Sequence, residues 1–377
     1  MIQFELVKTD KELFENALTF AQKQVRNLME IQPDYYPLYT HNGKWKHEGQ
    51  AWTHWCDGFL PGMMWVFRRH LPMDHPDKQF WMDCAIRYSQ PLEPRKLDRD
   101  VHDLGFIFLS SYYRWYRQTG DPKLNDVLVQ AGKTLAMRYQ EKGQYLSSFI
   151  ASNSLFIDIM MNVGIIFYAA HQTNDKRIRE IALRHCYTTR RVLVRGDGST
   201  AHEGIFDMET GEFLKQATHQ GYRGDSCWSR GLTWALYGFG SAYEYSRDPR
   251  FLETAEACAD YYITHAPTDG IAPWDFRAPT EQRQQLDTSA AAIAASGLFN
   301  LSDMTGDAAK SRFYNDYALQ IMDTLTEPEF LAIDTPGWEG VLKHGAYHER
   351  LGLGVDESVM WGEYFFLEAV AKVLGDE

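Results

Sequence analysis

The stretch from Asp103 to Arg117 reads DLGFIFLSSYYRWYR and runs into the turn Gln118–Pro122, QTGDP. Apolar residues recur in it at three- and four-residue spacing, which predicts a helix. The same periodicity fills Leu155–Ala170 and Gly231–Tyr245, so the chain is expected to be all-α. Strand-like alternation is confined to short stretches that we expect to form small β hairpins in loops, namely Ala201–Phe206 and Leu342–Tyr347.

The turn after this helix has counterparts along the chain. Each contains an aspartate just ahead of a helix with Ala and other apolar residues at helical spacing, and these aspartates are Asp121, Asp175, Asp248 and Asp307. Their separations of 54, 73 and 59 residues suit helical hairpins joined by long loops better than short solenoid repeats. About a dozen helices in about six hairpins predict an (α/α)6 barrel, with an open helical stack as the alternative. No linker divides the chain, so residues 1–377 are expected to form one domain.

The composition argues against several classes of protein. A formal net charge of −13 repels nucleic acid and anionic membrane surfaces. No segment has the ~18 uninterrupted apolar residues of a membrane span, and the N-terminus lacks the order of a secretory signal, so we expect a cytoplasmic protein. Five scattered cysteines without a CxxC pair predict free thiols. We expect no metal, no cofactor, and a monomer or weak homo-oligomer.

Asp158 is the first candidate for chemistry. It stands in LFIDIMMN, and a carboxylate on a helix this apolar is expected to face the interior, where burial raises its pKa. Asn162 lies four residues on, on the same helical face, and is expected to hold the Asp158 side chain in position. The alternative is a structural aspartate whose oxygens are satisfied by backbone groups.

Asp103 is the second candidate. It precedes an apolar helix in VHDLGF, where an aspartate is most simply an N-cap. It gains significance beside Asp158, because two carboxylates in one cleft titrate apart and one can stay protonated near neutral pH as a general acid.

A third cluster, Thr218–Trp234, reads THQGYRGDSCWSRGLTW. It brings a histidine, an amide, two arginines and two tryptophans into a loop that leads into a helix. Such a mixture suits a polar, anionic sugar, with an arginine fork for its carboxylate, although capping residues of a solvated loop account for part of it. Aromatic residues make up 14% of the chain, which fits sugar faces and a large core equally.

Several short motifs occur in a fixed order from about residue 50 onward: Trp55–Phe59, His102–Phe106, Ile157–Asn162, Leu193–Ser199, Thr218–Gly221, Trp274–Phe276, Asp287–Ala290 and Trp361–Tyr364. This ordered set resembles the unsaturated glucuronyl hydrolases of glycoside hydrolase family 88. The resemblance implies the (α/α)6 barrel and a reaction that hydrates the C4=C5 vinyl ether of an unsaturated uronate at the non-reducing end of an oligosaccharide.

By that resemblance, Asp158 donates a proton to C4 and then, as a base, activates the water that adds to C5. Asp103 matches the family's other aspartate and is expected to assist through hydrogen bonding and charge. The family's sugar contacts match Trp55, His102, His202, Gln220, Arg230, Trp234 and Tyr347. Core packing is the alternative for Trp55 and Trp234, and a loop hydrogen bond for His202. Arg230 is the expected clamp for the uronate carboxylate.

The chain departs from some relatives on the side of the leaving group. Members that process sulfated glycosaminoglycan fragments carry Ser-x-x-Ser-x-Lys after the tyrosine that matches Tyr347, whereas this chain has HERLGL at 348–353. That sulfate site is therefore not expected. The segment Gln144–Asn153 lacks a tryptophan found in some relatives, and Phe149 is the candidate apolar platform in its place.

Three other functions stay open. An unsaturated rhamnogalacturonyl hydrolase has the same barrel and a pectin-derived substrate. A sugar epimerase would use His102 and His219 as a proton-transfer pair. The third is a non-catalytic sugar-binding protein, which is disfavoured because burying the Asp158 carboxylate costs free energy that sugar binding alone does not require. The expected partner in the first reading is an unsaturated uronyl oligosaccharide of undetermined parent polysaccharide.

Overall fold

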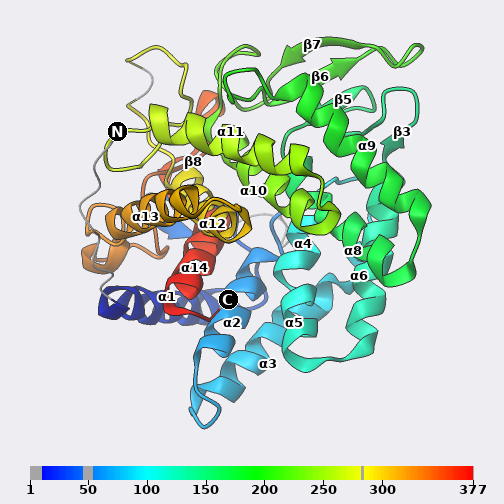
Figure 1. Cartoon of the computed structure of the whole chain (residues 1–377). Coiled ribbons are helices and arrows are strands. Elements are labelled where there is room, and N and C mark those ends of the chain that lie inside the picture. The colour runs from blue at the N-terminus through cyan, green and yellow to red at the C-terminus, as the bar shows by residue number, and fades with distance from the viewer. Residues whose placement is uncertain (1–10, 46–53, 282–283, 377) are drawn as a thin grey trace.

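The computed structural model describes residues 11–45, 54–281 and 284–376, and its consecutive helices pack in pairs around a ring (Figure 1). The inner helix of each pair faces the barrel axis. Two of the six inner helices are interrupted, so the inner ring comprises α2 (Phe59–His70), α4 (Leu104–Ser110) with α5 (Tyr112–Thr119), α7 (Ile159–Asn162) with α8 (Gly164–Thr173), α10 (Ser229–Ser246), α12 (Thr288–Met304) and α14 (Met360–Leu374).

Contacts between neighbouring inner helices close the ring. α2 packs against α4, α4 against α7 and α8, and α10 against α7 and α12, while α14 packs against both α12 and α2. The predicted (α/α)6 barrel is thereby confirmed, and the open stack is excluded.

The outer helices cover the inner ones and are α1 (Lys11–Ile31), α3 (Asp77–Ser89), α6 (Pro122–Ala136), α9 (Lys176–Leu193), α11 (Pro249–His265) and α13 (Ala308–Leu325). Four of them begin at the predicted aspartate turns, where the carboxylates of Asp121, Asp175, Asp248 and Asp307 accept main-chain N–H groups of the first turn. Burial separates the two layers: 14 of the 17 residues of α12 are buried, against 7 of the 18 in α13. The inner helix α12 is therefore apolar on nearly every side, whereas the outer helix α13 is amphipathic.

Glycines set the spacing of the inner ring. A Cβ on Gly105 of α4 would lie 2.4 Å from Cα of Asn162, and one on Gly238 of α10 would lie 2.6 Å from the main chain of Met160. Gly297 of α12 meets the Leu236 side chain in the same way, at 2.5 Å. At Gly105 and Gly238 no side chain fits, so these inner helices approach backbone to backbone, whereas at Gly297 the neighbour is a side chain.

Two predicted helices differ from the observed ones. The predicted helix 155–170 is wrong at its start, because Ser154–Phe156 forms strand β5 and pairs with β6, and the helix begins only at Ile159. The predicted helix 103–117 is interrupted at Ser111, where the hydroxyl groups of Ser110 and Ser111 bond to carbonyl oxygens one turn back.

The strands are short and lie in the loops, as expected. The predicted strand at 201–206 is confirmed as β6, and that at 342–347 begins only at Gly345, in β8. The strands are β1 (Thr40–His41), β2 (Lys44–Trp45), β3 (Tyr139–Gln140), β4 (Tyr145–Leu146), β5 (Ser154–Phe156), β6 (Glu203–Phe206), β7 (Phe213–Ala217), β8 (Gly345–His348) and β9 (Leu353–Glu357). The five cysteines all lie among the described residues, and none of them forms a disulfide. None of the described helices is both long and apolar enough to cross a membrane.

Candidate active site

Asp103 and Asp158 stand at the same kind of position in the barrel. Each directly precedes an inner helix, α4 and α7, and neither side chain makes a capping hydrogen bond. Asp103 thus occupies the predicted N-cap position of α4, but its side chain does not cap the helix. Asp103 is 5% exposed, and the side chain of Asp158 is 15% exposed, so both carboxyl groups face the interior of the loop layer at the N-terminal ends of the inner helices.

A histidine accompanies each carboxyl group. Nδ1 of His202 accepts the main-chain N–H groups of His219 and Gln220, both at 3.1 Å, which places the proton of the neutral ring on Nε2. This Nε2 lies 3.4 Å from Oδ2 of Asp158. Similarly, Nδ1 of His102 accepts the N–H of Phe149 at 3.0 Å.

The other ring nitrogen of His102, Nε2, lies 3.3 Å from Oδ1 of Asp103. Burial lowers the pKa of His102 to about 3, so this ring is neutral near pH 7. Each of the two histidines is thus fixed by main-chain donors and presents Nε2 to one carboxyl group.

The two carboxyl groups titrate apart. Burial, reinforced by the negative charge of Asp158, raises the pKa of Asp103 well above its usual value. Burial acts on Asp158 as well, but the adjacent His202 ring, whose Nε2 faces the carboxyl group, and the positive charge of Arg230 outweigh it and lower the pKa of Asp158. The expected splitting is present, whereas the expected rise at Asp158 is wrong. Asp158 lies in a loop beside a histidine rather than inside an apolar helix.

Asn162 ties the two segments together. Its Oδ1 accepts the N–H of Phe106 at 2.7 Å, and its Nδ2 donates to the main-chain oxygen of Asp158 at 3.2 Å. The prediction that Asn162 holds the Asp158 side chain is therefore corrected: it holds the backbone of Asp158, and joins it to the first turn of the helix that follows Asp103.

Aromatic rings surround the histidines. The Phe156 ring lies 4.4 Å from that of His202 and 5.8 Å from that of His102, centroid to centroid. Phe149 is 51% exposed and lies 5.5 Å from His102, a position consistent with the predicted apolar platform. Phe156 was not predicted as a site residue, because an apolar residue inside the predicted helix 155–170 is expected to pack in the core.

The guanidinium group of Arg230 is occupied by contacts within the protein. It is 1% exposed, pairs with Asp287 at 2.9 Å, and donates to the main-chain oxygens of Ala346 and Tyr347. Its guanidinium also lies over the Trp228 ring, 4.5 Å from the centroid. These contacts occupy the fork that was expected to clamp a uronate. The structure gives Arg230 a different place: it joins α10 to the β8 hairpin.

Asp287 was missed as a partner because it also caps α12. Its Oδ1 accepts the N–H of Ser289, while its Oδ2 pairs with Arg230. In the sequence, an aspartate ahead of Thr-Ser-Ala predicts only a helix cap. Nothing in the sequence therefore indicated that Asp287 also forms an ion pair with Arg230.

The remaining predicted contacts divide into two groups. Nε2 of Gln220 donates to the main-chain oxygen of Tyr347 at 3.3 Å, and the Tyr347 ring is stacked on the half-buried ring of Trp55, with centroids 6.2 Å apart. These three residues therefore adjoin His202 in one site. Trp234 is 1% exposed and packs against Phe106 at 4.9 Å, which supports core packing for this tryptophan.

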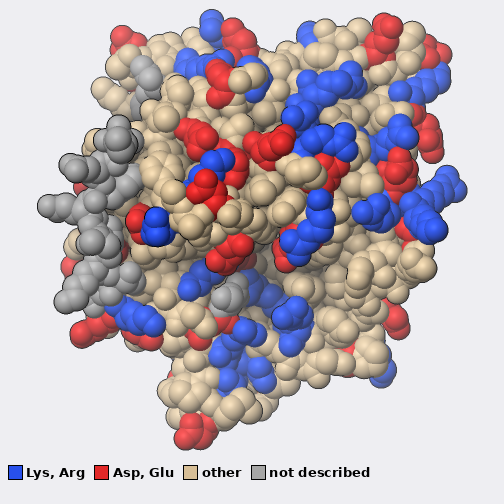
Figure 2. Space-filling model, in the orientation of Figure 1, with Lys and Arg blue, Asp and Glu red and all other residues tan. Residues whose placement is uncertain are grey.

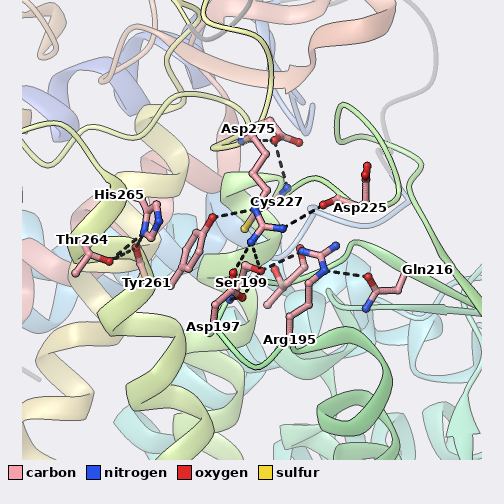
Figure 3. A network of polar contacts seen from close by, with 12 residues as sticks. Arg195, Asp197, Ser199, Gln216, Asp225, Cys227, Tyr261, Thr264, His265 and Asp275 are labelled. Atoms are coloured by element: carbon pink, nitrogen blue, oxygen red, sulfur yellow. Dashed lines mark hydrogen bonds and ion pairs between the residues drawn. The ribbon is translucent and has the colours of Figure 1, made fainter.

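A polar network that includes Arg195, Asp225 and Asp275 holds the segment that follows His219 and Gln220 (Figure 3). Buried Asp275 accepts the N–H of Tyr222 and the hydroxyl of Ser226 through Oδ2, and the N–H of Cys227 through Oδ1. Arg195 and Arg277 extend the network to the loop before β6. The network holds residues 222–227, which directly follow the two N–H groups that orient His202.

Among the described residues, no group of three or more His, Cys, Asp and Glu side chains is placed to hold a metal ion. Two carboxyl groups with opposite pKa shifts, lined by histidines and aromatic rings at one end of an (α/α)6 barrel, are the kind of site found in carbohydrate-active enzymes.

Comparison with known proteins identifies the family. The model of Glycosyl Hydrolase Family 88 matches residues 38–327, and the chain belongs to this family of glycoside hydrolases. It is 30% identical over 368 residues to an unsaturated chondroitin disaccharide hydrolase of Streptococcus agalactiae, covering 96% of this chain and 92% of the relative. It is 31% identical over 334 residues to an unsaturated glucuronyl hydrolase of Bacillus sp. strain GL1, covering 85% and 86%.

Solved structures agree with the sequence comparison. The crystal structure of the unsaturated glucuronyl hydrolase from Bacillus sp. GL1 superimposes with a TM-score of 0.87 at 27% identity, over 95% of this chain and 96% of that one.

Proposed function

We propose that this enzyme releases a Δ4,5-unsaturated glucuronic acid from the non-reducing end of short oligosaccharides. The names of its relatives, which act on unsaturated glucuronyl and unsaturated chondroitin substrates, support this substrate class. The reaction adds a proton to C4 and a water oxygen to C5. The hemiketal then opens at the C5–O5 bond to a C5 ketone, and C1, now a hemiacetal, expels the rest of the chain as an alcohol.

One observation carries the proposal: Oδ2 of Asp158 and Nε2 of His202 face each other, buried, and neither has a hydrogen-bond partner among the described residues. A separation of 3.4 Å is long for a hydrogen bond, and leaving both atoms unsatisfied costs free energy. Catalytic hydrogen bonds are commonly long before the substrate is bound, so we assign the pair to the reacting end of the sugar.

Asp158 is the proposed general acid and base. It is ionised in the free protein because its pKa is lowered. A bound uronate brings a second negative charge beside it, which raises the pKa of Asp158 and lets it take up a proton. It then protonates C4 and, once ionised again, accepts a proton from the water that attacks C5.

Asp103 is the proposed partner of Asp158. Because its pKa is raised, Asp103 is protonated when Asp158 is ionised, and it adds no second negative charge to the site. As a neutral acid it acts as a hydrogen-bond donor. We further propose that the sugar lies on Trp55, His102, Gln220 and Tyr347, with Arg230 and Trp234 as supports behind them.

The epimerase alternative requires His102 as a base. Nδ1 of His102 accepts the Phe149 N–H, and its Nε2 faces Asp103, so the ring has no lone pair free for a substrate proton. The one-domain organisation, the oligomeric state and the cytoplasmic location stay predictions.

The test follows the ultraviolet absorbance of the conjugated double bond in unsaturated uronyl disaccharides, sulfated and unsulfated, and in an unsaturated rhamnogalacturonyl disaccharide. We expect wild type to remove the absorbance of a glucuronyl disaccharide and Asp158→Asn to be slower by about 10²–10⁴-fold. Asp126→Asn, an exposed carboxylate on outer helix α6, is the matched control and should be unchanged. An Asp158→Asn enzyme within tenfold of wild type would remove Asp158 from the mechanism. Turnover of the rhamnogalacturonyl substrate alone would overturn the substrate assignment.

A further inference from the structure

A second cavity opens at the other end of the barrel. Its volume is about 720 Å³, and it is lined at the mouth by the last turns of α5, α8, α10 and α14. It reaches inward to Phe59, Phe106 and Phe365, which lie near the beginnings of inner helices. Asp103 and Asp158 precede α4 and α7 on the far side of these rings. The cavity and the candidate active site therefore enter the barrel from opposite ends.

The mouth of this cavity is basic although the chain is acidic. Among the described residues that line it, five side chains are cationic and two are carboxylates, an excess of three positive charges in a chain of net charge −13. Figure 2 shows Lys and Arg side chains around a hollow on the face where the C-terminus lies in Figure 1. The cations are Arg69, Arg114, Arg117, Arg247 and Lys372, and the carboxylates are Glu244 and Glu368.

Glu368 orders two of the cations and is itself fully engaged. Burial would raise its pKa, but the charges of Lys372 and Arg114 and several hydrogen bonds lower it to about 2, so Glu368 is ionised. It accepts bonds from Arg114 at 2.8 Å, Tyr237 at 2.8 Å and Ser296 at 2.6 Å. The single negative charge of Glu368 balances only one of the two positive charges of Arg114 and Lys372. Because its oxygens already accept these hydrogen bonds, Glu368 is not available to bind a neutral ligand.

The cations at the rim have no such partner. Arg117 and Arg247 are exposed and form no ion pair with any described residue; each lies beside a tyrosine ring, Tyr113 and Tyr243. An arginine without a carboxylate partner, beside a cavity that already holds excess positive charge, favours an anion.

We propose that this cavity binds a small carbohydrate anion, a mono- or disaccharide that carries a carboxylate or a phosphate group. Arginine forks bind either anion through paired charge-assisted hydrogen bonds. The buried rings of Phe106 and Phe365 form the apolar floor of the cavity, and the half-buried Tyr113 and exposed Tyr245 in its wall give the apolar face of a sugar a surface to lie on. The volume lies in the range of small-molecule sites.

The experiment titrates the full-length protein by calorimetry with glucuronate, glucose 6-phosphate and neutral glucose. The test variant is Arg117→Ala/Arg247→Ala, and the control is Arg177→Ala/Arg179→Ala, which removes the same charge from the exposed surface of α9. We expect at least one anion to bind wild type and the control equally, glucose to bind at least about tenfold more weakly, and the test variant to lose affinity at least about tenfold. Turnover of the unsaturated disaccharide should stay within twofold in both variants.

The anion that binds more tightly identifies the source, carboxylate or phosphate. Equal affinity for glucose would overturn the anion site. Unchanged anion binding in the test variant would place the anion elsewhere, including the candidate active site, and absence of binding by both anions at millimolar concentration would exclude the proposal. Because turnover is read separately, none of these outcomes is confused with a failure of the proposed catalytic function.

Discussion

Replacing Asn162 by alanine tests whether the two carboxyl groups depend on a shared positioning residue. The change removes the acceptor of the Phe106 N–H and the donor to the Asp158 carbonyl, at a fully buried position. An unsatisfied buried N–H costs about 1–3 kcal/mol, and the loss of the longer bond about 0.5–1.5 kcal/mol. We therefore expect the free energy of unfolding to fall by about 1.5–4.5 kcal/mol.

The effect on catalysis separates positioning from structural support. A shift of the Asp158 backbone by a fraction of an ångström misaligns its carboxyl group, so we expect kcat to fall by about 10–100-fold with KM changed by less than about threefold. The measurements are urea unfolding and steady-state kinetics on the unsaturated disaccharide. The matched control is Asn125→Ala, which removes the acceptor of the Tyr168 hydroxyl between α6 and α8, away from the carboxyl groups. Equal losses of kcat in both variants, or full kcat in Asn162→Ala, would refute the positioning role.

Three further predictions follow from packing and charge. Gly105→Ala puts a methyl group 2.4 Å from Cα of Asn162, so we expect urea unfolding to show a loss of about 1–3 kcal/mol or more, and an unchanged midpoint would contradict the close crossing. Arg230→Ala leaves Asp287 buried without its counter-ion, and we expect a loss of about 3–5 kcal/mol; a stable variant with only a raised KM would restore the original clamp prediction. Burial lowers the pKa of His185 to about 3, so the folded protein keeps this ring neutral while the unfolded chain takes up a proton below about pH 6.5. Stability should fall with pH from about 6.5 towards 3, and His185→Gln should reduce this slope by up to about 1.4 kcal/mol per pH unit, whereas equal slopes would refute the assignment.

The barrel could be predicted from the sequence because four of its outer helices begin at an aspartate turn that is recognisable in the sequence. Asp121, Asp175, Asp248 and Asp307 all cap a helix as expected, and capping depends on contacts within a few residues. The strand at 154–156 could not be predicted in the same way. Its apolar residues are compatible with either structure, and what decides is pairing with β6, about fifty residues later in the chain.

The site was predictable in its composition but not in its electrostatics. Asp103, Asp158, His102 and His202 were all named from motifs, and the structure brings them together. The direction of the Asp158 pKa depends on His202, which lies in a different loop, and the occupation of Arg230 depends on Asp287 and on carbonyl groups of the β8 hairpin. Such long-range partners leave no pattern in a single sequence.

The glycine crossings of the inner ring limit how this enzyme can diverge. At Gly105 and Gly238 the helices touch through main-chain atoms, so at these two crossings the barrel wall cannot be narrowed or widened by exchanging one side chain for another. We therefore expect new substrate preferences to arise mainly in the loops, above all in residues 144–153 and 348–353, where Phe149 and Leu351 are exposed. A library aimed at these two loops should retain folded members at a far higher frequency than one aimed at the helices.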